Sequence, residues 1–228
     1  RELCSSNADI QRVRATGALL LASATTVAEA RWLAAAGIDM VIAQGFEAGG
    51  HSGRFLPAPA GTEVGLFALV PQIADAVGLP VIAAGGIGDA RGIAAAFALG
   101  ASAVQLGTAY LHTPEATIAP AHRALLAGEA AEATRFTNLI SGRLARGLPN
   151  RLIEELGAVR AEAPPFPHAS TALAELRKAA EAAGRTDFST MWGGQAARLG
   201  TALPAEALTR QLADAALALF ARTGGSES

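Results

Sequence analysis

The chain lacks the features that mark secreted, membrane-bound and nucleic-acid-binding proteins. Its 228 residues include a single cysteine, Cys4, which excludes an internal disulfide framework and is typical of a reducing compartment. The formal net charge is -2 and no basic stripe is present, so nucleic acid is not an expected partner. No apolar run approaches the roughly 20 residues of a membrane span, and no signal peptide opens the chain. We therefore expect a soluble, cytoplasmic protein that does not associate with membranes.

Short apolar runs are present instead, and they predict buried strands. None of these runs alternates polar and apolar residues, which is typical of parallel strands that are covered on both faces. The four runs are Ala18–Ala22, Met40–Ala43, Val81–Ala84 and Ala103–Leu106.

Alanine-rich stretches between these runs predict helices. The first begins at Thr26, with Glu29 three residues later as its partner in a capping box. All three stretches end at a glycine, which is a common residue just beyond a helix C-terminus. The predicted helices run from Thr26 to Gly37, from about Glu63 to Gly78 and from about Asp89 to Gly100.

The order of strands and helices predicts an α/β fold. Strand and helix recur roughly every 20 to 25 residues, with one longer interval, as in a (β/α) barrel or a doubly wound sheet. Polar and glycine-rich loops follow each strand from Gln44 onward, as a ring of loops on one face of a barrel requires. The barrel is therefore favoured, and we assign residues 1–113 to it.

Residues 114–228 are predicted to form a helical lobe that packs near the barrel mouth. Apolar strand signals end at about Pro114. The segment Ala163–His168 contains three prolines and is predicted to be a rigid, extended linker. The predicted helices of this lobe are Glu115–Glu132, Thr171–Ala183 and Pro204–Ala221.

One loop at a predicted strand end carries a residue suited to proton transfer. The loop Gln44–Gly53 holds four glycines and one histidine, His51. Glycine lets a backbone approach a ligand closely, and the pKa of histidine lies near the working pH. The alternative is a flexible loop with a solvated histidine.

Two further loops are suited to phosphate binding. The loop Ala84–Asp89 runs from a strand into a helix, where backbone N–H groups and the helix dipole favour an anion. The loop Gln105–Thr108 offers an amide, a bare backbone and a hydroxyl. In many barrels a phosphate lies between the loops after the last two strands and a short helix, and these two loops follow that order.

In these stretches the sequence resembles the nitronate monooxygenase family, formerly called 2-nitropropane dioxygenases, which are FMN enzymes on a TIM barrel. The matching motifs are Val41–Gly45, Gly49–His51, Pro80–Ile87 and Gly100–Thr108. The later segments Ser141–Arg143, Arg146–Arg151 and Trp192–Gln195 also look like the C-terminal lobe of that family.

The resemblance implies FMN-dependent oxidation of alkyl nitronates by O2 to carbonyl compounds and nitrite, with nitroalkanes as a second substrate class. His51 would face the flavin, as a base on a nitroalkane or as a contact to a nitronate. No metal site is implied; the expected partners are the substrate and O2, and a homo-oligomer is compatible with the sequence. The residues implied to contact FMN are Gln44, Gly49, Gly50, Gly85, Gly86, Gln105, Leu106, Gly107 and Thr108.

The sequence leaves two other functions open. A flavin-dependent enoyl-acyl carrier protein reductase using NAD(P)H would share the loops Ala48–His51 and Ala84–Gly86. The first strands of the family's barrel and an early FMN-contacting loop are absent, so residues 1–113 would be only the last four βα units of a TIM (β/α)8-type barrel. Such a half barrel exposes two sheet edges, so the second alternative is a non-catalytic, truncated fragment.

Several other side chains admit two interpretations. Glu47 could orient His51 or cap the loop, and Trp192 could cover the active-site mouth or pack in the core. Arg54 and Phe55 could contact substrate, although a loop arginine is usually solvated. The arginines predicted to form either a phosphate patch or ordinary salt bridges are Arg143, Arg146 and Arg151. Of the remaining histidines, His112 could line the pocket but is better placed in packing or on the surface, His122 on a helix surface and His168 in a linker.

Overall fold

The computed structural model describes residues 7–57, 59 and 61–224, and the chain divides into two compact units. The first unit comprises Arg1–Phe46, Gly53–Leu106 and Leu212–Ser228. The second comprises Glu47–Ser52 and Gly107–Gln211. Cys4 lies outside the described residues.

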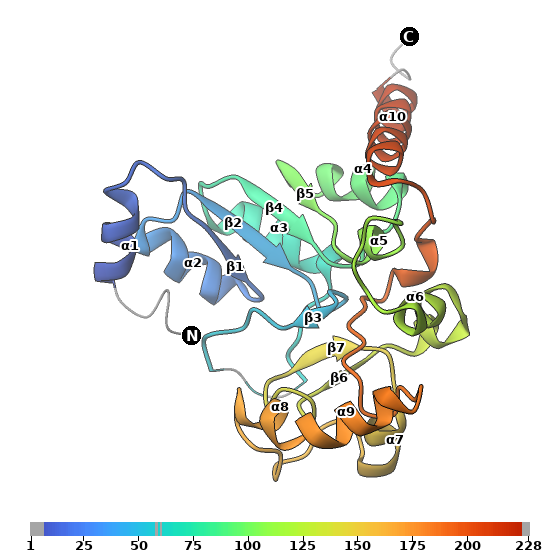
Figure 1. Ribbon diagram of the computed structural model, residues 1–228. Coiled ribbons are helices and arrows are strands. Elements are labelled where there is room, and N and C mark those ends of the chain that lie inside the picture. Colours follow the sequence, from blue (N-terminus) through green and yellow to red (C-terminus); the bar gives the residue numbers. More distant parts are fainter. Residues whose placement is uncertain (1–6, 58, 60, 225–228) are drawn as a thin grey trace. The chain divides into compact units, whose positions relative to one another are not determined.

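The first unit is built on a parallel sheet (Figure 1). Its strands are β1 (Leu21–Ala24), β2 (Met40–Gln44), β4 (Val81–Ala84) and β5 (Ala103–Gln105), in the order β1-β2-β4-β5. All neighbouring pairs are parallel, with Val41 opposite Val81 and Ala84 opposite Gln105. The four apolar runs of the sequence therefore form one sheet, although β1 begins three residues later than predicted.

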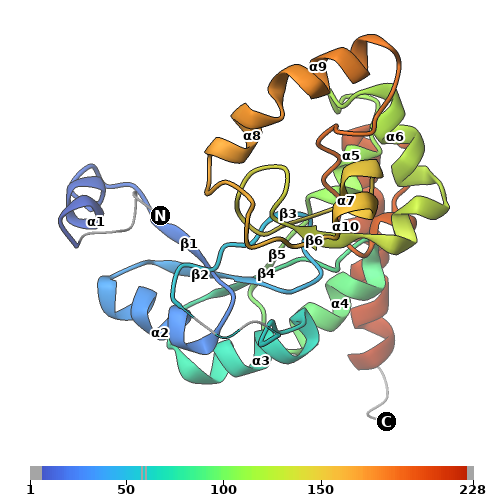
Figure 2. The same cartoon turned by 90° about the horizontal axis from the view of Figure 1, so that it is seen from below.

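The helices α2 (Val27–Ala36), α3 (Leu66–Ala76) and α4 (Ala90–Ala98) lie on one face of this sheet (Figure 2). The strands follow one another in sequence order, without the reversal of a doubly wound sheet. The first unit is therefore an α/β unit wound in one direction. Its largest fully buried side chains are Glu29, Leu33, Val41, Leu69, Val70, Ile73 and Val81. The unit also includes α1 (Asn7–Arg14) and the last part of α10 (Ala205–Gly224).

Local signals fix the ends of these helices. The Thr26 hydroxyl accepts the Glu29 N–H, and Gly37 closes α2 in a left-handed conformation with φ 87°. Asp89 caps α4 by accepting two N–H groups of its first turn. Helix α3 begins at Leu66 rather than near residue 63, because the carbonyl of Val64 accepts the N–H of Phe46 at 2.8 Å in an extended segment.

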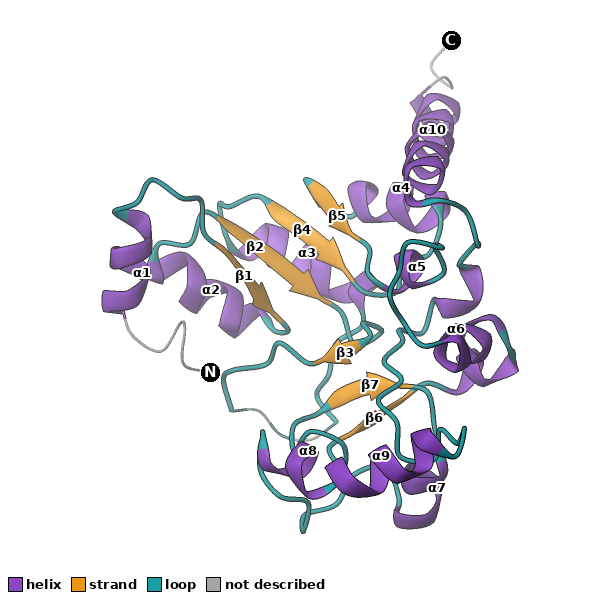
Figure 3. Cartoon of the chain, viewed as in Figure 1, coloured by secondary structure: helices purple, strands orange, loops and turns teal. Residues whose placement is uncertain are grey.

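The second unit contains a small antiparallel sheet (Figure 3). Its strands are β3 (Gly50–His51), β7 (Ala145–Gly147) and β6 (Arg135–Thr137), in the order β3-β7-β6. Two short 3-10 helices, η1 (Glu129–Ala133) and η2 (Ala197–Leu199), lie in this unit, and α10 begins in it. Its α-helices are α5 (Thr108–Leu111), α6 (Pro120–Ala127), α7 (Arg151–Leu156), α8 (His168–Ala172) and α9 (Ala174–Ala182).

The strands of this second sheet were not predicted, because each has two or three residues and leaves no periodic signal. The helix expected over 115–132 is divided at Gly128 into α6 and η1. The division into 1–113 and 114–228 stays a prediction. Within the described residues, no helix combines the length and apolarity needed to cross a membrane.

Candidate functional site

The carboxyl ends of three neighbouring strands bring together five of the predicted cofactor residues. Gln44 is the last residue of β2 and lies opposite Ala84, which ends β4. Ala84 in turn lies opposite Gln105, the last residue of β5. Gly85 and Gly86 follow β4, and Leu106 follows β5. The first unit thus places two carboxamides on either side of a glycine turn, at the edge where parallel α/β sheets bind ligands.

The glycine turn after β4 has two consecutive residues in the left-handed region. Gly85 and Gly86 have φ values of 102° and 69°, which residues with a Cβ rarely adopt. Asp89 accepts the N–H groups of Arg91 at 2.9 Å and Gly92 at 3.3 Å, so its own carboxylate occupies the N-terminus of α4. The expectation that the backbone N–H groups of this loop bind a phosphate stays a prediction.

Two residues considered as substrate contacts have partners within the first unit. Arg54 forms an ion pair with Glu63 at 3.6 Å, and Phe55 packs edge-on against Trp32 with ring centroids 5.3 Å apart. The segment they belong to starts at Gly53, whose N–H donates to the Gln44 side-chain oxygen at 2.5 Å. A Cβ at residue 53 would lie 2.9 Å from that oxygen, so this close approach requires glycine.

His51 lies in β3, where its backbone pairs with Ala145 of β7. Its Nε2 is 2.8 Å from the hydroxyl of Ser141, and its ring meets the edges of Phe166 and Trp192 at centroid distances of 5.7 and 5.6 Å. The pKa of His51 is lowered, first by withdrawal of part of the ring from water and second by the positive charge of Arg143. His51 remains exposed to solvent, so a neutral imidazole is presented there as a proton acceptor.

Packing explains one glycine of the His51 loop. A Cβ on Gly49 would lie 2.6 Å from the backbone nitrogen of Gly194, so the loop requires glycine where it meets the segment after Trp192. The N–H of Gln195 donates to the Glu47 carbonyl at 3.0 Å across the same contact. Gly50 has a φ of 76°, the left-handed region in which glycine is favoured.

The last two predicted phosphate contacts open helix α5 in the second unit. Gly107 is its N-cap, and a Cβ there would meet no atom within 4 Å. The Thr108 hydroxyl accepts the N–H of Gly194 at 2.9 Å, which ties this helix to the glycine pair after Trp192.

The three arginines do not form one phosphate patch. Arg143 donates to the Ser52 carbonyl at 2.9 Å. Arg146 is 2% exposed, donates to the Thr134 carbonyl at 3.0 Å and stacks over the Phe136 ring at 4.5 Å. Burial lowers the pKa of Arg146, and the charge of Glu47 acts in the opposite direction. The exposed Arg151 bonds Glu155 at 2.6 Å, so it is salt-bridged as the alternative interpretation predicts.

The remaining aromatic candidates are mainly structural. The prediction that His122 lies on a helix surface is wrong: it is buried, with Nε2 2.8 Å from the Trp192 carbonyl. His112 is buried, and His168 is exposed at the start of α8. Trp192 is partly buried and packs against a cluster of buried residues, as one of its two interpretations predicts, and its ring also contacts that of His51. The residues of that cluster are Leu139, Ile140, Leu152 and Ile153. That Trp192 covers the active-site mouth stays a prediction.

Ser141 and Glu29 contact residues in or next to the His51 loop. The sequence assigned neither of them a role in the site. Ser141 binds the His51 ring, and its signal was its place in the Ser141–Arg143 motif. Glu29 was expected only to complete a capping box. Its carboxylate instead accepts the N–H groups of Phe55 and Leu56, which follow the His51 loop.

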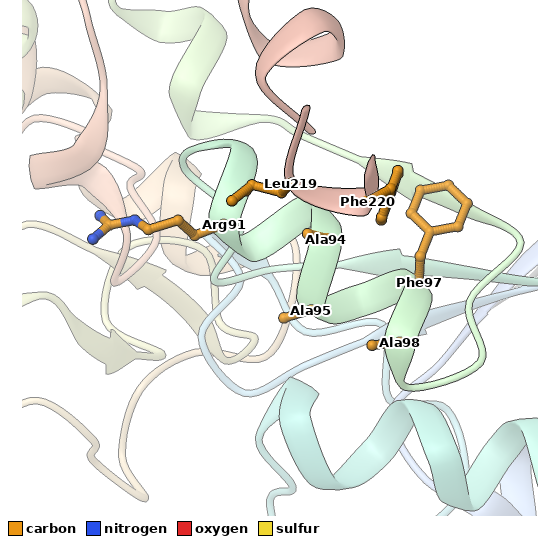
Figure 4. A pocket seen from close by; sticks show the side chains of 7 residues that line it. All are labelled: Arg91, Ala94, Ala95, Phe97, Ala98, Leu219 and Phe220. Carbon is orange, nitrogen blue, oxygen red and sulfur yellow. The ribbon is translucent and has the colours of Figure 1, made fainter. Parts of the chain in front are cut away.

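A hollow of about 620 Å³ lies between α4 and the end of α10 in the first unit (Figure 4). Its lining is apolar apart from Arg91, which is exposed and bonds Asp89. None of the predicted site residues lines it, so this hollow is separate from the proposed chemistry. The residues that line it are Arg91, Ala94, Ala95, Phe97, Ala98, Leu219 and Phe220.

Known proteins resemble nearly the whole chain. The family model described as nitronate monooxygenase matches residues 4–214. A nitronate monooxygenase of Pseudomonas aeruginosa is 46% identical over 206 residues, which are 90% of this chain and 59% of the relative. One from Paraburkholderia phytofirmans is 48% identical over 205 residues, 89% of this chain and 56% of the relative.

A solved structure shows the same likeness. The nitroalkane oxidase of Streptomyces ansochromogenes is 42% identical, with a TM-score of 0.87 over 97% of this chain and 63% of that chain. The present chain thus spans somewhat more than half the length of the two sequence relatives.

Proposed function

The chain belongs to the nitronate monooxygenase family, and from this premise we propose that it oxidises alkyl nitronates and nitroalkanes with O2, giving carbonyl compounds and nitrite. The observation that carries the proposal is the setting of His51. Its imidazole is exposed, is held by Ser141, and has a pKa lowered by partial burial and by Arg143. Such a group is neutral near physiological pH and suited to accept a proton.

We propose FMN as the flavin. Support comes from the donor set at the sheet edge, where the Gly85–Gly86 turn suits a phosphate and the carboxamides of Gln44 and Gln105 can donate and accept hydrogen bonds. Two-electron oxidation followed by reaction with O2 is the chemistry that the group supplies when bound. The residues proposed to hold it are Gln44, Gly49, Gly50, Gly85, Gly86, Gln105, Leu106, Gly107 and Thr108.

The first unit is further proposed to represent four βα units of a TIM (β/α)8-type barrel. Sequential strand order and helices on one face of the sheet support this assignment, because both features recur around such a barrel. The division into a barrel part, 1–113, and a lobe, 114–228, belongs to the same proposal.

His51 has a different proposed role for each of the two substrate classes. A nitroalkane is neutral and must lose a proton from the carbon that bears the nitro group, so His51 acts as the base. A nitronate is already the conjugate base, so His51 serves only as a contact. The ratio of activities on the two substrates therefore reports proton abstraction separately from binding.

The pH dependence of nitroalkane oxidation follows from this role. The base is active when neutral, so activity rises with pH through the pKa of His51. Because burial and Arg143 lower that pKa, the acidic limb of kcat/KM is expected to lie below the usual pKa of histidine. Arg143→Gln should move the limb to higher pH, whereas Arg143→Lys, which keeps the charge, should move it less. A limb that does not respond to Arg143→Gln would contradict the assignment.

Turnover under air tests the proposed function. With FMN present, propionate 3-nitronate is expected to yield nitrite with consumption of O2. The alternative, an enoyl thioester reductase, predicts that NADH bleaches the flavin rapidly and that an enoyl thioester is reduced without nitrite release from the nitronate. That second result would overturn the proposal.

A further inference from the structure

Ser141 contacts the ring of the proposed base. Its hydroxyl is 2.8 Å from His51 Nε2, and its side chain belongs to a residue only 5% exposed. The two residues are 90 positions apart in the chain and are brought together within the second unit. A hydroxyl at this distance from a ring nitrogen can either donate to it or accept from it, and the direction decides which nitrogen carries the proton.

The single proton of the Ser141 hydroxyl has another acceptor. The oxygen lies 3.1 Å from the carbonyl of Arg143, and a carbonyl can only accept a hydrogen bond. The backbone N–H of Arg143 approaches the same hydroxyl at 3.4 Å and can only donate to it. With its proton directed to the carbonyl, the Ser141 oxygen accepts from His51, and in this arrangement Nε2 carries the hydrogen.

From this count we propose that Ser141 is a positioning residue that holds His51 as the Nε2–H tautomer and so makes Nδ1 the nitrogen that takes the substrate proton. A neutral imidazole has one N–H and one lone pair, so fixing the hydrogen on Nε2 fixes the lone pair on Nδ1. The proton moves from the carbon of a nitroalkane to Nδ1, and the electron pair of the broken C–H bond stays on the resulting nitronate. The catalytic part of this inference rests on the proposed function.

Hydrogen bonds of the neighbouring residues fix the positions of His51 and Ser141 relative to each other. The N–H of Ser52 donates to the Leu144 carbonyl at 2.9 Å, and the Arg143 guanidinium donates to the Ser52 carbonyl at 2.9 Å. The segment after Ser141 therefore bonds both backbone groups of Ser52, the residue that follows His51. These bonds keep the distance between His51 Nε2 and the Ser141 hydroxyl constant. A constant distance is required if the hydrogen bond is to hold His51 in one tautomer.

Packing restrains both the turn and the ring. Gly142 has a φ of 85°, and a Cβ there would collide with the backbone of Pro164 and Phe166. The side chain of Phe166 and that of Trp192 meet the His51 ring with their planes inclined at 79° and 63°. Rotation of the imidazole that would exchange its two nitrogens is opposed by these two aromatic contacts.

The tautomer can be observed directly by NMR. The chain has four histidines, so long-range proton–nitrogen spectra of protein labelled with ¹⁵N-histidine contain four ring systems, and His51→Asn assigns one of them. At a pH where His51 is neutral, its Nδ1 is expected to resonate as an unprotonated nitrogen. In Ser141→Ala the signal should move towards that of a tautomer mixture. In Ser141→Thr, which retains the hydroxyl, the signal should stay in place.

Kinetics supply the second readout. Ser141→Ala should lower kcat for a nitroalkane about 10- to 100-fold, with little change in KM, and Ser141→Thr should restore most of the loss. The inference is overturned if the wild-type ring carries its proton on Nδ1, or if the spectrum of Ser141→Ala is unchanged. Because the spectra need no turnover, an Nε2–H ring in a protein that oxidises no nitroalkane would refute the proposed function while leaving the tautomer assignment intact.

Discussion

Replacing His51 by asparagine is expected to lower the rate of nitroalkane oxidation about 10²- to 10⁴-fold, the usual contribution of a general base. Asparagine keeps a polar group that can bond Ser141, but it has no nitrogen that titrates near neutral pH. Flavin content should stay close to that of the wild type, because the proposed phosphate contacts lie on other strand ends. Steady-state rates on a neutral nitroalkane, combined with the flavin-to-protein ratio, measure both quantities.

The substrate comparison makes this prediction specific. Oxidation of a preformed nitronate should fall much less than oxidation of the corresponding nitroalkane, because the nitronate needs no base. His168→Asn is a matched control, since His168 is an exposed histidine at the start of α8, and it should leave both rates unchanged. Equal losses on the two substrates would reduce His51 to a binding contact, and full nitroalkane activity in His51→Asn would remove it from the reaction.

Replacing Glu29 by alanine is expected to destabilise the protein by roughly 3 to 5 kcal/mol. Glu29 is fully buried, and one carboxylate oxygen accepts the N–H and the hydroxyl of Thr25 at 2.7 and 2.8 Å. The other accepts the N–H groups of Phe55 and Leu56 at 2.6 and 2.9 Å. Alanine would leave four donors without this acceptor, and each buried donor left unpaired costs about 1 to 3 kcal/mol. Water can reach the partly buried Phe55 and Leu56. The expected destabilisation is therefore smaller than the summed cost of four unpaired donors.

Two further variants separate this network from ordinary helix effects. Glu175 occupies the first turn of α9, as Glu29 does in α2, but it is exposed, so Glu175→Ala should change stability little. Glu29→Gln places an amide NH2 against two of the four donors and should lose about half of the stabilisation. Urea unfolding followed by tryptophan fluorescence is suitable, because Trp32 packs on Phe55. Equal midpoints for Glu29→Ala and Glu175→Ala would contradict the role assigned to Glu29.

Local signals predicted the strands and several helix ends of the first unit. Threonine at 26, aspartate at 89 and glycine at 37 set helix ends through bonds to residues within a few positions, so the sequence predicts them well. The apolar runs likewise predicted the parallel strands, because a strand buried on both faces is apolar throughout. The register then placed Gln44 and Gln105 beside the glycine turn, as the order of the loops indicated.

Contacts between distant residues were beyond the sequence patterns. The pairing of His51 with Ser141 depends on β3 and β7, which are too short to show a periodic signal. Glu29 looked like half of a capping box, yet its carboxylate bonds a loop 26 residues further on. In both cases the chemistry of the residue type was visible, but the partner was supplied only by the fold.

We propose that this chain binds FMN and oxidises nitronates, and an anaerobic absorption spectrum tests this most directly. The protein is mixed with FMN, freed of unbound flavin and titrated without O2 with propionate 3-nitronate. We expect stoichiometric bound flavin whose oxidised absorbance is lost on addition of the nitronate and not on addition of NADH. A protein that retains no flavin, or one whose flavin is bleached by NADH but not by the nitronate, would contradict it.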